Sequence, residues 1–142
     1  MCSDFSLHLL QISYQLEHLA VRNFNSNFHF VGDTNNIITA LELSFSESSL
    51  FIGTKSGNVY ILDVSNFKLK DLVINQENII KSISSKDLKK PGSVETLADK
   101  PNDTGKILIG FSRSLIALWN YETETIVNYF FIEQVSLFSY YY

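Results

Sequence analysis

The stretch that decides the fold is Ile107–Asn120, ILIGFSRSLIALWN, read together with the earlier stretch Leu50–Asp63, LFIGTKSGNVYILD. The two stretches align without a gap at a constant offset of 57 residues. Each contains two apolar runs of strand length, separated by a short polar turn. In the earlier copy the turn contains Gly57, which adopts a positive φ without steric cost. The pattern therefore predicts a β-hairpin in each copy.

The repeat extends beyond these hairpins on both sides. An apolar run precedes each hairpin, at residues 37–41 and 94–98, and a more polar outer strand is expected after each, at residues 67–72 and 126–131. Ser6–Ile12 starts the chain as a copy of the last hairpin strand. Four short antiparallel strands that recur along a chain are typical of β-propeller blades. The fold class we expect is all-β, with about two and a half WD40-type blades of an incomplete propeller.

The repeat also predicts how the chain is divided. We expect closing strands of a preceding blade at 1–31, a blade at 37–73, an inserted loop at 74–92, a second blade at 93–133 and a tail at 134–142. A short helical turn is expected near Glu77–Ile83, and the alternating apolar residues of 24–31 read as an outer strand. Since propellers close with about 4–8 blades, we also expect the chain to be a fragment of a longer protein or a truncated gene product.

Composition narrows the classes of function. The chain has 142 residues, a net charge of −4 and no dense Lys/Arg cluster, which disfavours nucleic-acid binding. Its single cysteine, Cys2, cannot form an internal disulfide. The N-terminus lacks the basic region of a signal peptide, and no apolar run is long enough to span a membrane. We therefore expect a cytosolic protein.

No residue pattern in the sequence predicts catalysis. His8, His18 and His29 lack metal-ligand spacing, and Cys2 is too isolated to complete a zinc site. Gly53 and Gly57 are not followed by the Lys-Ser/Thr of a phosphate loop. The carboxylates are scattered, and no pair stands out: Asp33, Glu42, Glu47, Asp63, Asp71, Glu77, Asp87 and Glu95. We assign no catalytic, cofactor-binding or metal residue, expect no cofactor and no small-molecule substrate, and predict that the chain is not an enzyme.

Two features carry both a functional and a structural interpretation. Lys81–Lys90 holds four lysines and three serines, so phosphorylation could weaken its contact with an acidic membrane or a partner. The simpler interpretation is a solvated surface loop. Trp119, with Phe111 and Tyr121, could anchor a partner, but a buried residue that packs between blades is the favoured interpretation.

The same stretches resemble lethal giant larvae proteins. Ile52–Tyr60 is similar to one blade of that family, and Val94–Leu97 followed by Ile107–Asn120 is similar to the next blade. The long polar insert matches the family's layout, and the resemblance covers most of residues 4–133. Its most specific part is the run Gly110–Arg113. Tomosyn, a syntaxin-binding relative, is similar but lacks the Ser-Arg pair, which favours lethal giant larvae.

Two positions depart from the family pattern. Ser114 stands where the family has glycine, which puts the tightness of that turn in doubt. Asn120 stands where the family has aspartate, which puts the usual hydrogen bond of the Trp-Asp ending in doubt.

The resemblance implies a function in scaffolding. Proteins of this family are cytoplasmic scaffolds at the cell cortex and peripheral plasma membrane, with two propellers, that act in cell polarity and exocytosis. The partners implied by the resemblance are syntaxin and other SNARE proteins, non-muscle myosin II and a polarity-complex kinase, with GTPase-activator activity as a further implied role. Two alternatives stay open: a generic WD-repeat module of another complex, and an enzyme built on a β-propeller or β-sandwich.

Overall fold

The computed structural model describes residues 6–12, 16–23, 37–83, 90–100 and 105–132. Their elements, in chain order, are β1 (Ser6–Ile12), β2 (Leu16–Asn23), β3 (Ile38–Leu43), β4 (Ser49–Thr54), β5 (Val59–Asp63), β6 (Lys68–Ile74), α1 (Gln76–Ser82), β7 (Val94–Asp99), β8 (Lys106–Phe111), β9 (Leu115–Asn120) and β10 (Thr125–Phe131). Within the described ranges the structure is therefore mostly β, with a single short helix.

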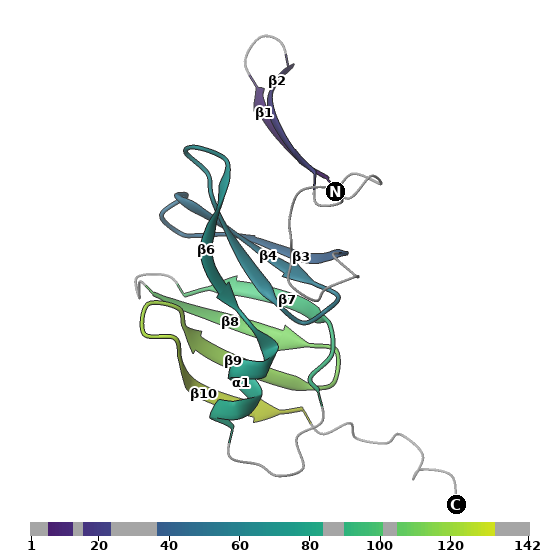
Figure 1. Ribbon diagram of the computed structural model, residues 1–142, viewed down its shortest axis with the longest axis vertical. Helices are drawn as coiled ribbons and strands as arrows, with labels where there is room; N and C mark the ends of the chain where they lie inside the picture. Colours follow the sequence, from purple (N-terminus) through teal and green to yellow (C-terminus); the bar gives the residue numbers. More distant parts are fainter. Residues whose placement is uncertain (1–5, 13–15, 24–36, 84–89, 101–104, 133–142) are drawn as a thin grey trace, which may run out of the picture.

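The strands form a hairpin and two four-stranded antiparallel sheets (Figure 1). β1 pairs with β2 in the hairpin. Sheet 1 has the order β3-β4-β5-β6, and sheet 2 has the order β7-β8-β9-β10. Within each sheet, strands that follow one another in sequence therefore also lie side by side, as in an antiparallel meander. This confirms the prediction of an all-β fold built from repeated four-stranded units.

Several predictions fall on residues that the structure does not describe. These are the outer-strand pattern of residues 24–31, most of the Lys81–Lys90 loop, and the tail at 134–142. The division of the chain into a preceding blade, two blades and an insert stays a prediction. The expected helical turn near Glu77–Ile83 is confirmed by α1. One strand boundary was wrong: Phe67 lies in the turn before β6, not in the strand, because its φ is 54°.

Equivalent turn residues of the two sheets have similar backbone φ angles. Gly57 has a φ of 89° and its equivalent Ser114 has a φ of 64°. Phe67 and its equivalent Glu124 have φ values of 54° and 53°. The same turns are therefore built twice from different residues. Ser114 adopts the left-handed region that Gly57 occupies in the other copy, at the steric cost that a residue with a Cβ atom has there.

The departure at Asn120 leaves the local turn intact. Asp63 Oδ1 accepts hydrogen bonds from the backbone N–H of Ser65 at 2.8 Å and of Asn66 at 3.4 Å. Asn120 Oδ1 accepts the equivalent bonds from Glu122 at 2.9 Å and Thr123 at 3.0 Å. An amide oxygen thus replaces a carboxylate oxygen as the acceptor, because the turn needs an acceptor rather than a charge.

The main core lies between the two sheets. Buried aliphatic and aromatic side chains of both sheets form one cluster, which includes Phe51, Val59 and Ile61 from sheet 1 and Ile107, Ile109, Leu115, Ala117 and Trp119 from sheet 2. Trp119 is only 2 % exposed, which confirms that it is a core residue. Each fully buried Val, Leu, Ile or Phe side chain contributes roughly 1.5–3 kcal/mol by its burial.

Helix α1 extends this core at the outer end of the sheets. Ile79 and Ile83 are buried in the same cluster, and the helix lies beside β10 in Figure 1. The helix is too short to be stable alone. We infer that its apolar residues, packed on the sheets, hold it in place.

The first strands of the two sheets, β3 and β7, run next to each other, and β4 also contacts β7. A Cβ atom at Gly53 would lie 2.5 Å from Cγ1 of Val94, so the absent side chain lets β4 approach β7. Polar links close one end of the same seam. Asp99 Oδ2 accepts a hydrogen bond from Phe45 N at 2.8 Å, and Asp99 N donates to Glu42 Oε1 at 3.2 Å.

We predict that Gly53→Ala lowers the free energy of unfolding by about 1–3 kcal/mol, because the new methyl group meets the fully buried Val94. The matched control is Gly110→Ala, at the equivalent position of sheet 2. Its Cβ would meet Cγ2 of Thr96, an exposed side chain with solvent beside it, so the loss of stability should be smaller than for Gly53→Ala. Urea denaturation checks both variants. Equal losses would contradict the close inter-sheet approach.

We also predict that Ser114→Gly raises the free energy of unfolding by roughly 0.5–1 kcal/mol, since glycine removes the cost of a left-handed conformation. The reverse change in the other copy, Gly57→Ser, should lower stability, because its Cβ would also lie 2.5 Å from the carbonyl oxygen of Gly92. Thermal unfolding of the two variants gives the comparison. A destabilised Ser114→Gly variant would show that the turn is not strained.

Candidate functional site

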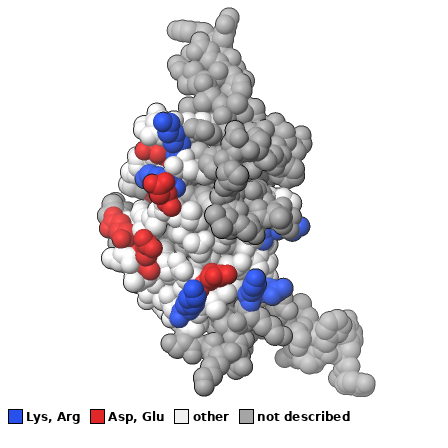
Figure 2. All heavy atoms as spheres, in the orientation of Figure 1, with Lys and Arg blue, Asp and Glu red and all other residues white. Residues whose placement is uncertain are grey.

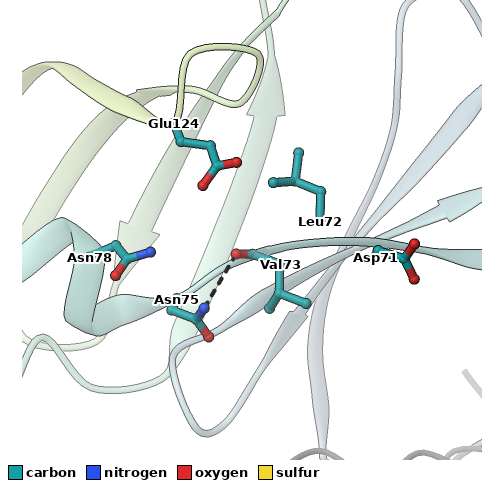
Figure 3. Close-up of a pocket in the computed structure, with 6 residues that line it drawn as sticks. All are labelled: Asp71, Leu72, Val73, Asn75, Asn78 and Glu124. Atoms are coloured by element: carbon teal, nitrogen blue, oxygen red, sulfur yellow. Dashed lines mark hydrogen bonds between the residues drawn. The ribbon is translucent and has the colours of Figure 1, made fainter.

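An open hollow of about 470 Å³ lies where sheet 1, α1 and sheet 2 meet at the outer edge. One side of the hollow is formed by β6, through Asp71, Leu72 and Val73. The start of α1 forms a second side through Asn75 and Asn78, and the β9–β10 turn contributes Glu124. Figure 3 shows the carboxylate of Glu124 pointing from its turn toward the strand. Residues about 50 positions apart in sequence therefore share one surface feature.

The hollow offers mainly hydrogen-bond acceptors. Its two charged lining groups are the carboxylates of Asp71 and Glu124, and Lys and Arg are absent among its lining residues. Asn75 donates a long hydrogen bond of 3.4 Å from Nδ2 to the Val73 carbonyl, drawn in Figure 3. Such a surface suits a cationic or hydrogen-bond-donating group of a ligand. Elsewhere on the face shown in Figure 2, basic and acidic side chains are interspersed over the described residues.

The histidines and the cysteine do not form a described site. His8 lies on β1 opposite Val21, and His18 lies on β2 opposite Leu10. His29 and Cys2 lie outside the described residues. Within the part of the chain that the structure describes, His, Cys, Asp and Glu do not gather in a group of three that could hold a metal ion. The same described part has no helix that is long and apolar enough to cross a membrane.

Three of the six candidate carboxylates that the structure describes make hydrogen bonds to nearby groups. Glu42 links β3 to β7, and Asp63 builds the β5–β6 turn. Asp71 lines the hollow, and Glu95 accepts a hydrogen bond from the Ser93 hydroxyl at 2.8 Å. Glu47 has a positive φ in the turn before β4, and Glu77 lies in the first turn of α1. Asp33 and Asp87 lie outside the described residues.

Among the residues that the structure describes, Asp63 and Tyr121 have shifted pKa values, and local structure explains each shift. The Ser65 hydroxyl, which donates to Asp63, lowers the pKa of that exposed carboxyl. Burial raises the pKa of the Tyr121 phenol, although its oxygen accepts a hydrogen bond from Gly105 N at 3.1 Å. The Tyr121 ring packs on Phe51, with 5.3 Å between ring centroids. Neither group lines the hollow.

A second candidate surface is the face of sheet 2 that points away from sheet 1. Leu108, Ile116 and Leu118 are half-buried there. Their equivalents in sheet 1 are Phe51, Val59 and Ile61, which are at most 2 % exposed because sheet 2 covers them. The open face of sheet 2 thus repeats, position by position, the face that sheet 1 uses for packing.

The sequence alone did not single out Glu124 or Asn78 as residues of the hollow. The repeat places Glu124 in a turn equivalent to the one that contains Phe67, but it says nothing of the turn's neighbours. The contact between this turn and the β6–α1 junction arises from the stacking of the two sheets. The one sequence feature that pointed to this region was the long insert after β6. It contains α1, whose first residues line the hollow.

Comparisons with curated proteins place most of this chain alongside lethal giant larvae proteins. The chain is 32 % identical over 89 residues to Lethal(2) giant larvae protein of Drosophila melanogaster, which is 63 % of this chain and 8 % of that protein. It is 30 % identical over 88 residues to LLGL scribble cell polarity complex component 2 of Homo sapiens, which is 60 % of this chain and 9 % of that protein. The chain thus spans about a tenth of these relatives. No family model matches it.

Solved structures give the architecture. The C-terminal WD40 domain of Sif2 aligns with a TM-score of 0.62 and 16 % identity, over 92 % of this chain and 32 % of that one. The RRP9 WD40 repeats align with a TM-score of 0.54 and 18 % identity, over 72 % of this chain and 28 % of that one. These likenesses confirm WD40-type sheets. The sequence matches, separately, confirm the resemblance of this chain to lethal giant larvae proteins.

Proposed function

We propose that this chain is part of a protein-binding scaffold that acts in cell polarity. The observation that carries the proposal is the sequence similarity to lethal giant larvae and cell polarity complex proteins. The fold supports it, because two sheets packed through one core form a rigid support that presents turns and loops to partners. The hollow beside Glu124 is the described surface that we propose for such contacts.

The finer assignments rest on the resemblance. We propose that this scaffold works in the cytoplasm at the cell cortex, in peripheral contact with the plasma membrane. We also propose that it contributes to regulated exocytosis through syntaxin and other SNARE proteins. Non-muscle myosin II and a polarity-complex kinase are the further partners that we propose, with GTPase-activator activity as an additional role. None of these roles requires a cofactor, a nucleic acid or a small-molecule substrate.

A role without catalysis is part of the same proposal. Among the described carboxylates, Glu42 and Asp63 make structural hydrogen bonds, and Asp71 and Glu124 line an open hollow. The two shifted pKa values have local structural causes. General acid–base chemistry instead requires groups held within hydrogen-bond reach of a substrate. Scaffolding accounts for these features without any further group.

The proposal predicts that the segments are interchangeable. In Drosophila Lethal(2) giant larvae protein, the matched segment is replaced by the matched segment of this chain, and the chimera is expressed in epithelia that lack the native protein. We expect restored apicobasal polarity, measured by the positions of apical and basolateral markers. A folded and abundant chimera that leaves polarity lost would contradict the proposal and favour a generic WD-repeat module.

A matched pair of chimeras separates folding from binding. Trp119→Ala in the inserted segment removes a buried side chain, at a cost of about 3–5 kcal/mol, and should lower the abundance of the chimera. Glu124→Gln changes only the charge of an exposed residue that lines the hollow. It should leave abundance unchanged and reports whether the hollow contributes to polarity.

A further inference from the structure

Strand β10 is an edge strand with an unusually apolar surface. It lies at the end of sheet 2 and pairs on one side with β9. From Thr125 to Ile132 the sequence TIVNYFFI contains no charged residue and no proline. Val127, Tyr129, Phe130, Phe131 and Ile132 are between 39 % and 54 % exposed. Natural sheets usually protect such an edge with charge, proline or a covering element.

The hydrogen-bond pattern shows which backbone groups face outward. Ile132 N donates to the Ser114 carbonyl at 2.7 Å, and Phe130 lies opposite Ile116 in the ladder with β9. In an antiparallel pair the inward-bonded residues alternate with outward-facing ones. The N–H and C=O groups of Tyr129 and Phe131 therefore point away from β9, toward the place where another strand would lie.

One of these outward groups is already occupied by a side chain. Asn128 Oδ1 accepts a hydrogen bond from Tyr129 N at 2.8 Å. This bond occupies the Tyr129 N–H, one of the donors to which an incoming strand would bind. The bulge between Ile126 and Asn128 also bends the start of the strand. The edge is thus partly protected, without any charge.

We propose that β10 pairs antiparallel with β10 of a second copy of this chain, in the register that places Phe130 opposite Phe130 of the other copy. In this register Tyr129 of each copy lies opposite Phe131 of the other, so the outward N–H and C=O groups of both residues find partners. The strand supplies no charge that would require a different partner of opposite charge. Sheet 2 of one copy and sheet 2 of the other then form one continuous sheet across a two-fold axis.

The side chains fit this register. Tyr129 and Phe131 already contact each other edge to face within one chain, with 6.1 Å between ring centroids and an angle of 78°. Aromatic pairs across strands stabilise sheets by roughly 0.2–1 kcal/mol each. The exposed parts of Tyr129, Phe130 and Phe131 amount to roughly 200–350 Å² per copy, taking 150–250 Å² for a fully buried aromatic side chain. This area is small for a stable complex, so the dimer is weak and depends on concentration.

The test is sedimentation equilibrium of the 142-residue chain over a wide range of concentration. We expect a reversible monomer–dimer equilibrium. Phe131→Pro removes an outward N–H without touching the ladder to β9, and should weaken the dimer by roughly tenfold or more. Phe131→Lys places a charge on the edge and should have the same effect. Asn128→Ala frees the Tyr129 N–H and should tighten the dimer by roughly two- to tenfold.

The controls keep the result interpretable. Phe45→Lys changes an apolar residue that is 69 % exposed in another turn, and should leave the dimer unchanged. Circular dichroism verifies that every variant remains folded, and hydrogen exchange should show protection of the Phe131 amide only at high concentration. A strict monomer, open-ended aggregation, or a dimer that ignores all the β10 changes would each overturn the proposal.

Discussion

The packing of sheet 2 on sheet 1 is the interaction on which the rest of the described structure depends. Trp119 and its aliphatic neighbours cover Phe51, Val59 and Ile61, and this contact also anchors Ile79 of α1. An isolated four-stranded sheet would leave such a face in water, whereas stacking removes it at roughly 25 cal/mol per Å². The hollow beside Glu124 exists because the same stacking brings the β9–β10 turn to the β6–α1 junction.

The repeat of 57 residues explains why one face of sheet 1 packs against the opposite face of sheet 2. Equivalent residues occupy equivalent faces, so the face that sheet 1 turns toward sheet 2 reappears on sheet 2 as the half-buried row of Leu108, Ile116 and Leu118. Gly53 and Gly110 show the same principle at the backbone. The first is closed in by Val94 of the neighbouring sheet, whereas the second meets a threonine of its own sheet. A propeller is built by repeating this one contact.

The fold could be read from the sequence because its signals are local and occur twice. Apolar runs of strand length, the glycine turn at Gly57 and the recurrence at Ile109–Gly110 needed no tertiary knowledge. The position of Phe67 was misread because an apolar residue in a left-handed turn looks like the start of a strand. The residues of the hollow could not be predicted, since Asp71 and Glu124 become neighbours only through packing. The protection of Tyr129 N by Asn128 is likewise a property of side-chain geometry.

The central claim, that the two sheets are one cooperative unit held by their shared core, is tested most directly by native-state amide hydrogen exchange on β4, β5, β8 and β9. The account predicts that the slowest amides of both sheets share one opening free energy, and that Trp119→Ala lowers it in both sheets by the same amount, about 3–5 kcal/mol. If sheet 1 kept its protection while sheet 2 lost its own, the sheets would be independent and the claim would be wrong.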